Sequence, residues 1–84
     1  MLLYLKELMP NRLISEIARD IRKAWRLPNF AALPYLDAMH QLDKITDKFM
    51  ADDARSIVLY FLSNANTFRG PTAKALKAEL KGLL

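Results

Sequence analysis

The chain lacks cysteine and holds only one histidine and two glycines among its 84 residues. Without cysteine it can form no disulfide, no thiolate nucleophile and no zinc–thiolate site. The single histidine, His40, has no second histidine with which to bind zinc and no identifiable nucleophile to activate. Ser56 and Ser63 lie in no nucleophile elbow. We therefore expect a protein that is not an enzyme and that uses no cofactor and no metal.

The aspartates in the middle of the chain match no metal-binding motif. Their spacing lacks the alternating oxygen ligands, the central glycine and the terminal glutamate of an EF-hand loop. The four residues are Asp43, Asp47, Asp52 and Asp53. Solvated loop acids explain them better, with Asp52 or Asp53 as the N-cap of a helix.

Long apolar runs are also missing. The N-terminal MLLYL is interrupted by Lys6 and Glu7, which makes it too short for a membrane span and unlike a secretory signal. With 52% hydrophobic residues the chain is instead typical of a packed globular protein. We expect one helical domain over residues 1–84, with residues 1–9 as a candidate peripheral extension. We also expect a soluble, cytoplasmic protein without membrane contact.

Helical periodicity runs through the sequence and predicts an all-α fold, a compact bundle of four to five short helices. The expected helices span residues 2–9, 11–25, 30–42, 52–68 and 71–83. Pro10 ends the first, Asn11 caps the second and Pro34 lies in the first turn of the third. Gly70 is expected to end the fourth, in the left-handed conformation. Ile45 and Phe49 are spaced like one further helical turn.

The apolar faces of these helices predict the core, with the fourth helix at its centre. The predicted core residues are Leu13, Ile17, Ile21, Trp25, Leu36, Met39, Ile57, Phe61, Phe68, Leu76 and Leu80.

The net charge of +4 is unevenly spread along the chain. Residues 1–26 carry +3, residues 27–55 carry −2 and residues 56–84 carry +3. Two basic helix faces result, one formed by Arg12, Arg19, Lys23 and Arg26 and the other by Lys74, Lys77 and Lys81. Either face could bind phosphates or an acidic protein, or could simply be solvated.

Residues 52–83 have the outline of a helix-turn-helix, with the last helix in the reading position. Lys74, Lys77 and Lys81 could hold phosphates, but that helix offers no Asn, Gln or Arg for bidentate base contacts. An ordinary pair of antiparallel helices is the alternative interpretation.

Residues 56–68 carry no charge, although 26% of the chain is charged. Helical projection divides this segment into an apolar side and a polar, uncharged side formed by Tyr60, Ser63, Asn64 and Thr67. Such a surface suits a protein partner, because interface cores are poor in charge and rich in tyrosine. Alternatively, neighbouring helices cover it within the bundle.

The segments PNFAALPYLDAM and SIVLYFLSNANTFRGPTAKALKAELKGLL resemble parts of a group of small uncharacterised proteins encoded by bacteriophages, plasmids and other mobile elements. The resemblance covers about residues 12–84. It implies an accessory role in a bacterial host cell, such as binding and blocking a defence complex, for example a CRISPR effector. It assigns no role to any residue.

Three hypotheses of function follow. The first is a non-enzymatic binding protein of a phage or mobile element that contacts a host or phage protein and inhibits a host defence system. The second is a nucleic-acid-binding module that uses the basic helices. The third is a homodimer that pairs through the uncharged side of the fourth helix.

Overall fold

Four α-helices, one 3₁₀ turn and a two-stranded ribbon form residues 12–84, the part of the chain that this computed structural model describes. In chain order the elements are α2 (Ile14–Ala24), η1 (Phe30–Ala32), α3 (Leu33–Met39), β1 (Lys48–Phe49), β2 (Asp52–Asp53), α4 (Ala54–Ser63) and α5 (Pro71–Leu83). The prediction of a mostly helical fold is confirmed, and the ribbon is an addition to it. The predicted helix over residues 2–9, its end at Pro10 and the Asn11 cap concern residues outside the described range.

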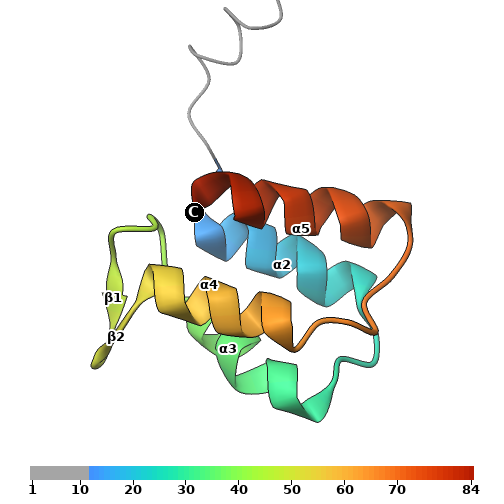
Figure 1. Ribbon diagram of the computed structural model, residues 1–84, viewed down its shortest axis with the longest axis horizontal. Helices are drawn as coiled ribbons and strands as arrows, with labels where there is room; N and C mark the ends of the chain where they lie inside the picture. The colour runs from blue at the N-terminus through green and yellow to red at the C-terminus, as the bar shows by residue number, and fades with distance from the viewer. Residues whose placement is uncertain (1–11) are drawn as a thin grey trace, which may run out of the picture.

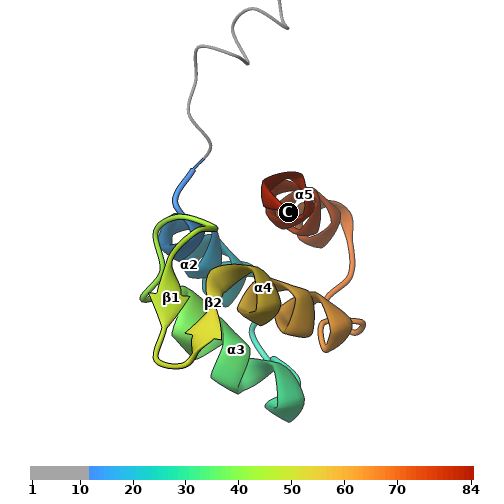
Figure 2. The same ribbon diagram turned by 60° about the vertical axis from the view of Figure 1, so that its left-hand side comes forward.

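The helices pack around α2. It lies along α5 on one side and against α3 on the other, while α4 packs mainly on α3 (Figures 1 and 2). The prediction that the fourth helix is central is wrong, because α2 packs against both α3 and α5, whereas α4 packs mainly on α3. None of the described helices is both long and apolar enough to cross a membrane.

A single cluster of buried apolar side chains holds these elements together. The indole ring of Trp25 stacks on the ring of Phe68 at 5.1 Å and meets Phe61 edge-on at 6.2 Å. These contacts join the end of α2 to α4 and to the connection that follows α4. Every predicted core residue is buried except Leu13, which is 39% exposed. Leu13 is the N-cap of α2, so its side chain precedes the first packed turn.

The start of α2 depends on residues far away in the sequence. The backbone N–H groups of Ile14 and Ser15 donate to the carbonyls of Asp43 and Leu42, at 2.9 and 2.8 Å. The carboxylate of Glu16 accepts the N–H of Leu13 at 2.9 Å. The unpaired donors of a helix N-terminus need such partners. The helix therefore begins where the loop after α3 can reach it.

The predicted cap of α4 is correct but its predicted end is not. Asp53 caps the helix, and its carboxylate accepts the N–H of Ser56 at 2.7 Å. The helix stops at Ser63, five residues before the expected end at Phe68. Its last carbonyls find side-chain partners instead, because the amide of Asn64 donates to the Tyr60 carbonyl at 2.8 Å.

Gly70 adopts a positive φ of 107°, but it serves as the N-cap of α5 rather than the end of α4. The third predicted helix is also shorter than expected. It begins as the 3₁₀ turn η1, continues as α3 with Pro34 in its first turn, and ends at Met39.

The ribbon pairs Lys48 with Asp53 and Phe49 with Asp52 in antiparallel register. A two-residue connection joins its strands, with Met50 at a φ of 56°. The prediction of a helical turn here is wrong, although Ile45 and Phe49 do pack against the core as expected. Glycine or asparagine usually marks such a connection, and the sequence has neither there.

Candidate protein-binding surface

The polar, uncharged side of α4 faces solvent. Tyr60 is 52% exposed, Ser63 and Thr67 are exposed and Asn64 is partly buried. No other helix covers this side within residues 12–84. We call these four residues the uncharged face; Leu59, 42% exposed, adjoins it.

Most of the polar donors on the uncharged face are already engaged. The hydroxyl of Ser63 donates to the Leu59 carbonyl at 3.0 Å, one helical turn back. The hydroxyl of Thr67 donates to the side-chain oxygen of Asn29 at 2.8 Å, and the amide of Asn29 donates to the Asn64 carbonyl at 3.1 Å. Donors that are buried without a hydrogen bond oppose association. Because these donors are already paired within the protein, a partner can cover them without that cost.

Tyr60 belongs to an aromatic pair that bridges two helices. Its ring lies 5.5 Å from that of Tyr35 on α3, at an interplanar angle of 40°. Tyrosines offer a large contact area with few rotatable bonds, and they are enriched at protein interfaces. The sequence predicted Tyr60 on this surface. The pairing across α3 and α4 requires the tertiary structure.

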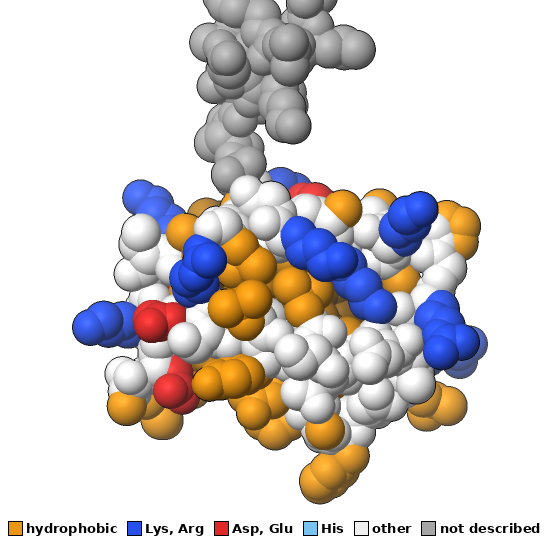
Figure 3. Space-filling view, viewed as in Figure 1, with side chains coloured by type: hydrophobic (Ala, Val, Ile, Leu, Met, Phe, Trp, Pro, Cys, Tyr) orange, Lys and Arg blue, Asp and Glu red, His pale blue; other side chains and the backbone are white. Residues whose placement is uncertain are grey.

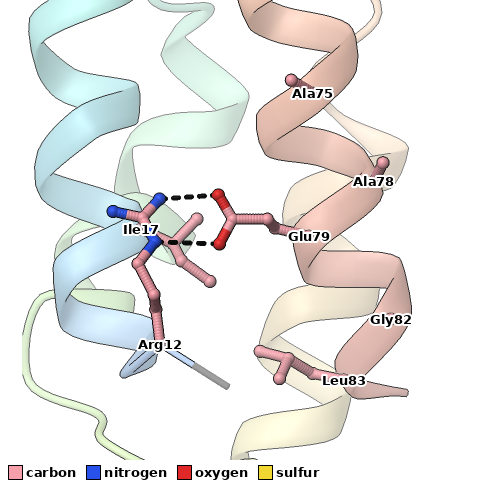
Figure 4. A pocket seen from close by; sticks show the side chains of 7 residues that line it. All are labelled: Arg12, Ile17, Ala75, Ala78, Glu79, Gly82 and Leu83. Atoms are coloured by element: carbon pink, nitrogen blue, oxygen red, sulfur yellow. Dashed lines mark hydrogen bonds and ion pairs between the residues drawn. The ribbon is translucent and has the colours of Figure 1, made fainter. Parts of the chain in front are cut away.

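Arg12, the first residue of the predicted basic face on α2, is bound within the molecule. Its guanidinium forms two hydrogen bonds with the carboxylate of Glu79 on α5, at 2.6 and 2.9 Å (Figure 4). It forms a third with the carboxylate of Asp20, at 2.7 Å. The hydrogen bonds to Glu79 and Asp20 raise the pKa of Arg12, and the bond from Arg12 lowers the pKa of Asp20. This group pins α2 to α5 beside a pocket of about 350 Å³. The other members of the face, Arg19, Lys23 and Arg26, are exposed.

Lys77 on α5 is likewise engaged. Its ammonium donates to the Phe68 carbonyl at 2.6 Å and sits 5.7 Å from the centre of the Phe68 ring. Burial lowers the pKa of Lys77, and the positive charges of Lys81 and Arg69 lower it further. Lys74 and Lys81 are exposed.

The lysines of the predicted basic face on α5 lie on the side of that helix away from Arg12. Glu79 marks the side of α5 that meets α2. At about 100° per residue, Lys74, Lys77 and Lys81 lie roughly 140–200° around the helix from Glu79. The structure therefore does not join these lysines to the α2 face in one continuous basic surface. The last helix also packs along α2 rather than crossing α4 as a helix-turn-helix requires.

Arg69 is a basic residue that sequence analysis left out of its candidate surfaces. Together with Lys74 and Lys77 it lines a pocket of about 410 Å³, with Phe68 and Gly70 as the remaining walls. No acidic side chain lines it. The sequence does hold a signal for this grouping. Arg69 comes just before the Gly-Pro that opens α5, and Lys74 and Lys77 follow in the first two turns of that helix.

The aspartates of the middle segment act on the backbone. Asp47 accepts the N–H groups of Asp43 and Lys44 at 3.0 and 2.9 Å, and these bonds lower its pKa. The bonds from Ser56 similarly lower the pKa of Asp53. Within residues 12–84 no three acidic or histidine side chains gather as a metal site would need.

His40 lies beside an ion pair rather than a nucleophile. The guanidinium of Arg22 pairs with the carboxylate of Asp37. The Nε of the same arginine donates to the Nε2 of His40 at 3.5 Å. Partial burial and the positive charge of Arg22 lower the pKa of His40. Neither pocket described above includes this histidine.

Comparison with known family models, with curated proteins and with solved structures found no match to this chain. The surface itself is therefore the basis for assigning a function.

Proposed function

We propose that the protein is a small, non-enzymatic binding protein that acts through protein–protein contact, with the uncharged face of α4 as its docking surface. The observation that carries the proposal is the half-exposed Tyr60, paired with Tyr35 on a surface without charge. Covering this surface removes a large aromatic area from water and desolvates no ion, which is the combination that favours association.

The wider role that we propose rests on the resemblance to small proteins of phages and mobile elements. Such a protein would act inside the bacterial host cell, where it would bind a component of a defence system such as a CRISPR effector and block it. Small size and a single docking face suit an inhibitor that works by occupying a surface.

A nucleic-acid-binding role is the second candidate, and exposed Arg69, Lys74 and Lys81 are the observation in its favour. Two features reduce its support. Arg12 and Lys77 are engaged by protein groups, and the lysines of α5 lie on the side of that helix away from Arg12.

A pull-down from bacterial lysate tests the proposal, with and without nuclease. The bait would be wild type, a Tyr60→Glu/Ser63→Glu variant, or a matched Arg19→Glu/Lys23→Glu variant that places two new carboxylates on α2. We expect a protein partner that survives nuclease, is retained by the α2 variant and is lost with the α4 variant. The efficiency of phage plating should change in cells that express the α4 variant and should stay as with wild type in cells that express the α2 variant.

Recovery of no partner at physiological salt, together with an unchanged plating efficiency, would contradict the proposal. A partner that disappears on nuclease treatment would favour the second candidate instead.

A further inference from the structure

The side of α4 that faces α5 carries a stripe formed by Arg55, Leu59 and Leu62, spaced so that all three point the same way. The guanidinium of Arg55 donates to the carbonyl of Leu84, so this stripe faces the end of α5. On α5 the matching stripe is Lys77, Lys81 and Leu84. We call these six residues the α4–α5 face.

The α4–α5 face combines an apolar centre with a cationic border. Leu59 is 42% exposed, and Leu62 and Leu84 are partly buried. Figure 3 shows apolar side chains between α4 and α5 with Lys and Arg side chains around them. At the far end the border continues into the pocket of Arg69, Lys74 and Lys77.

Negative charge is almost absent from the segment that forms α4 and α5. Residues 54–84 hold five basic side chains and a single acidic one, Glu79. Glu79 faces α2, where Arg12 occupies both of its oxygens. Within residues 12–84 no ion pair involves Arg69, Lys74 or Lys81. Arg55 differs from them, because its charge acts on Asp53 and helps to lower the pKa of that carboxyl.

From this arrangement we propose that the partner that docks on the uncharged face also covers the adjoining α4–α5 face, where it presents an acidic amphipathic segment with apolar side chains at helical spacing and carboxylates on either side of them. Its apolar side chains would cover Leu59 and Leu62. Its carboxylates would meet Lys81 and Lys74, with one of them in the pocket beside Arg69. The inference rests on the proposed function and adds the chemistry of the partner to it.

Charge distinguishes an acidic amphipathic segment from two other candidate partners, a second copy of the chain and a nucleic acid. A second copy of the chain would bring its own lysines and arginines against these, and like charges across an interface oppose association. A nucleic acid would match the cations, but it would leave the central leucines facing phosphates, and the border offers no free aromatic ring on which a base could stack. An acidic amphipathic segment matches both the centre and the border.

The test is a selection of random peptides, each long enough for about four helical turns, on the immobilised full-length protein. We expect the enriched peptides to carry an excess of Asp and Glu and to repeat Leu, Ile, Phe or Trp every three or four residues. Their chemical-shift footprint on the labelled protein should fall on α4 and α5.

Charge reversal then checks the border. Lys74→Glu/Lys81→Glu should weaken the selected peptides at least about tenfold, and the affinity of the wild type should fall as salt rises. The matched Arg19→Glu/Lys23→Glu variant should change the affinity less than about twofold, since both charges lie away from this face. Thermal unfolding of each variant shows that the exposed substitutions leave the fold intact.

Enriched peptides without excess acid, with a footprint on Tyr60 and Ser63, would overturn this inference and leave the proposed function standing. Displacement of the selected peptides by an unrelated DNA oligonucleotide would overturn it in favour of a nucleic acid. Failure to select any peptide would also overturn it, whereas the pull-down with Tyr60→Glu/Ser63→Glu judges the proposed function separately.

Discussion

The helices α2 and α4 have similar lengths and similar buried faces, but their outer faces differ in every respect that matters for binding. The outer face of α2 is charged, and two ion pairs tie this helix to its neighbours, Arg12 with Glu79 and Arg22 with Asp37. The outer face of α4 is uncharged over Tyr60 and Ser63.

This difference shows how a small domain can keep one surface hydrated and another suited to association with a partner. Ions on the outside of α2 lose hydration when a partner covers them, which opposes association. On the outside of α4 the hydroxyl of Ser63 and the amide of Asn64 already donate to backbone carbonyls, so covering them leaves these donors paired.

The two adjacent residues Phe61 and Tyr60 should respond very differently to truncation. Phe61→Ala removes a fully buried ring that contacts Trp25, and we expect it to lower the free energy of unfolding by about 3–5 kcal/mol. Tyr60→Ala should cost less than about 1 kcal/mol, because its ring is half exposed. Urea denaturation of both variants measures the difference. Similar losses for the two would mean that the outer face of α4 carries structure rather than function.

Gly70→Ala should be the next largest effect. Gly70 combines a φ of 107° with a ψ of 174°, a region that only glycine occupies readily. No atom lies within 4 Å of the position where a Cβ would stand, so the cost comes from the backbone alone. We expect a loss of about 1–3 kcal/mol in the free energy of unfolding. Gly82→Ala is the control, since Gly82 lies within α5, where its added Cβ also meets nothing, and it should be neutral or stabilising.

Arg12→Ala should separate α2 from α5 at one end. Its guanidinium and both carboxylates are about two-fifths exposed, so solvent screens the pairs and we expect a loss of only about 1 kcal/mol. The loss should shrink as salt is added. Arg19→Ala, which removes an exposed charge from α2, is the control and should have no effect. Equal effects of the two variants in urea denaturation would show that the network contributes nothing.

Acid should weaken the fold through Asp47 and Asp53, which accept backbone N–H groups. Their pKa values are lowered in the folded protein, so their stabilisation is complete above the unfolded value of about 4 and is lost as the pH falls through the folded values. Melting temperatures measured from pH 6 down to pH 2 should therefore fall below about pH 4. Asp47→Asn with Asp53→Asn should flatten this decline. An unchanged decline in the double variant would assign the acid sensitivity to other groups.

The sequence predicted the helical segments and the core well, because apolar spacing alone carries that information. Ile17, Phe61, Leu76 and Leu80 are buried as their periodicity requires. The cap at Asp53 and the proline at the start of α5 were also predictable, since each acts on its own helix.

What the sequence could not supply depends on contacts between distant segments. The early end of α4 involves Asn29, which bonds to the Asn64 carbonyl from 35 residues away in the chain. Local pattern also could not show that Arg12 reaches Glu79, which removes one cation from the predicted basic face. The exposure of the uncharged face was left open by the sequence for the same reason, because it depends on α5 packing along α2 and leaving α4 open.

The uncharged face of α4 is the docking surface that we propose for this protein. The most direct measurement is partner capture by the Tyr60→Glu/Ser63→Glu variant, beside wild type and Arg19→Glu/Lys23→Glu, all shown to be folded by thermal unfolding. We expect that only the Tyr60→Glu/Ser63→Glu variant loses the protein partner. Equal capture by all three baits would contradict it.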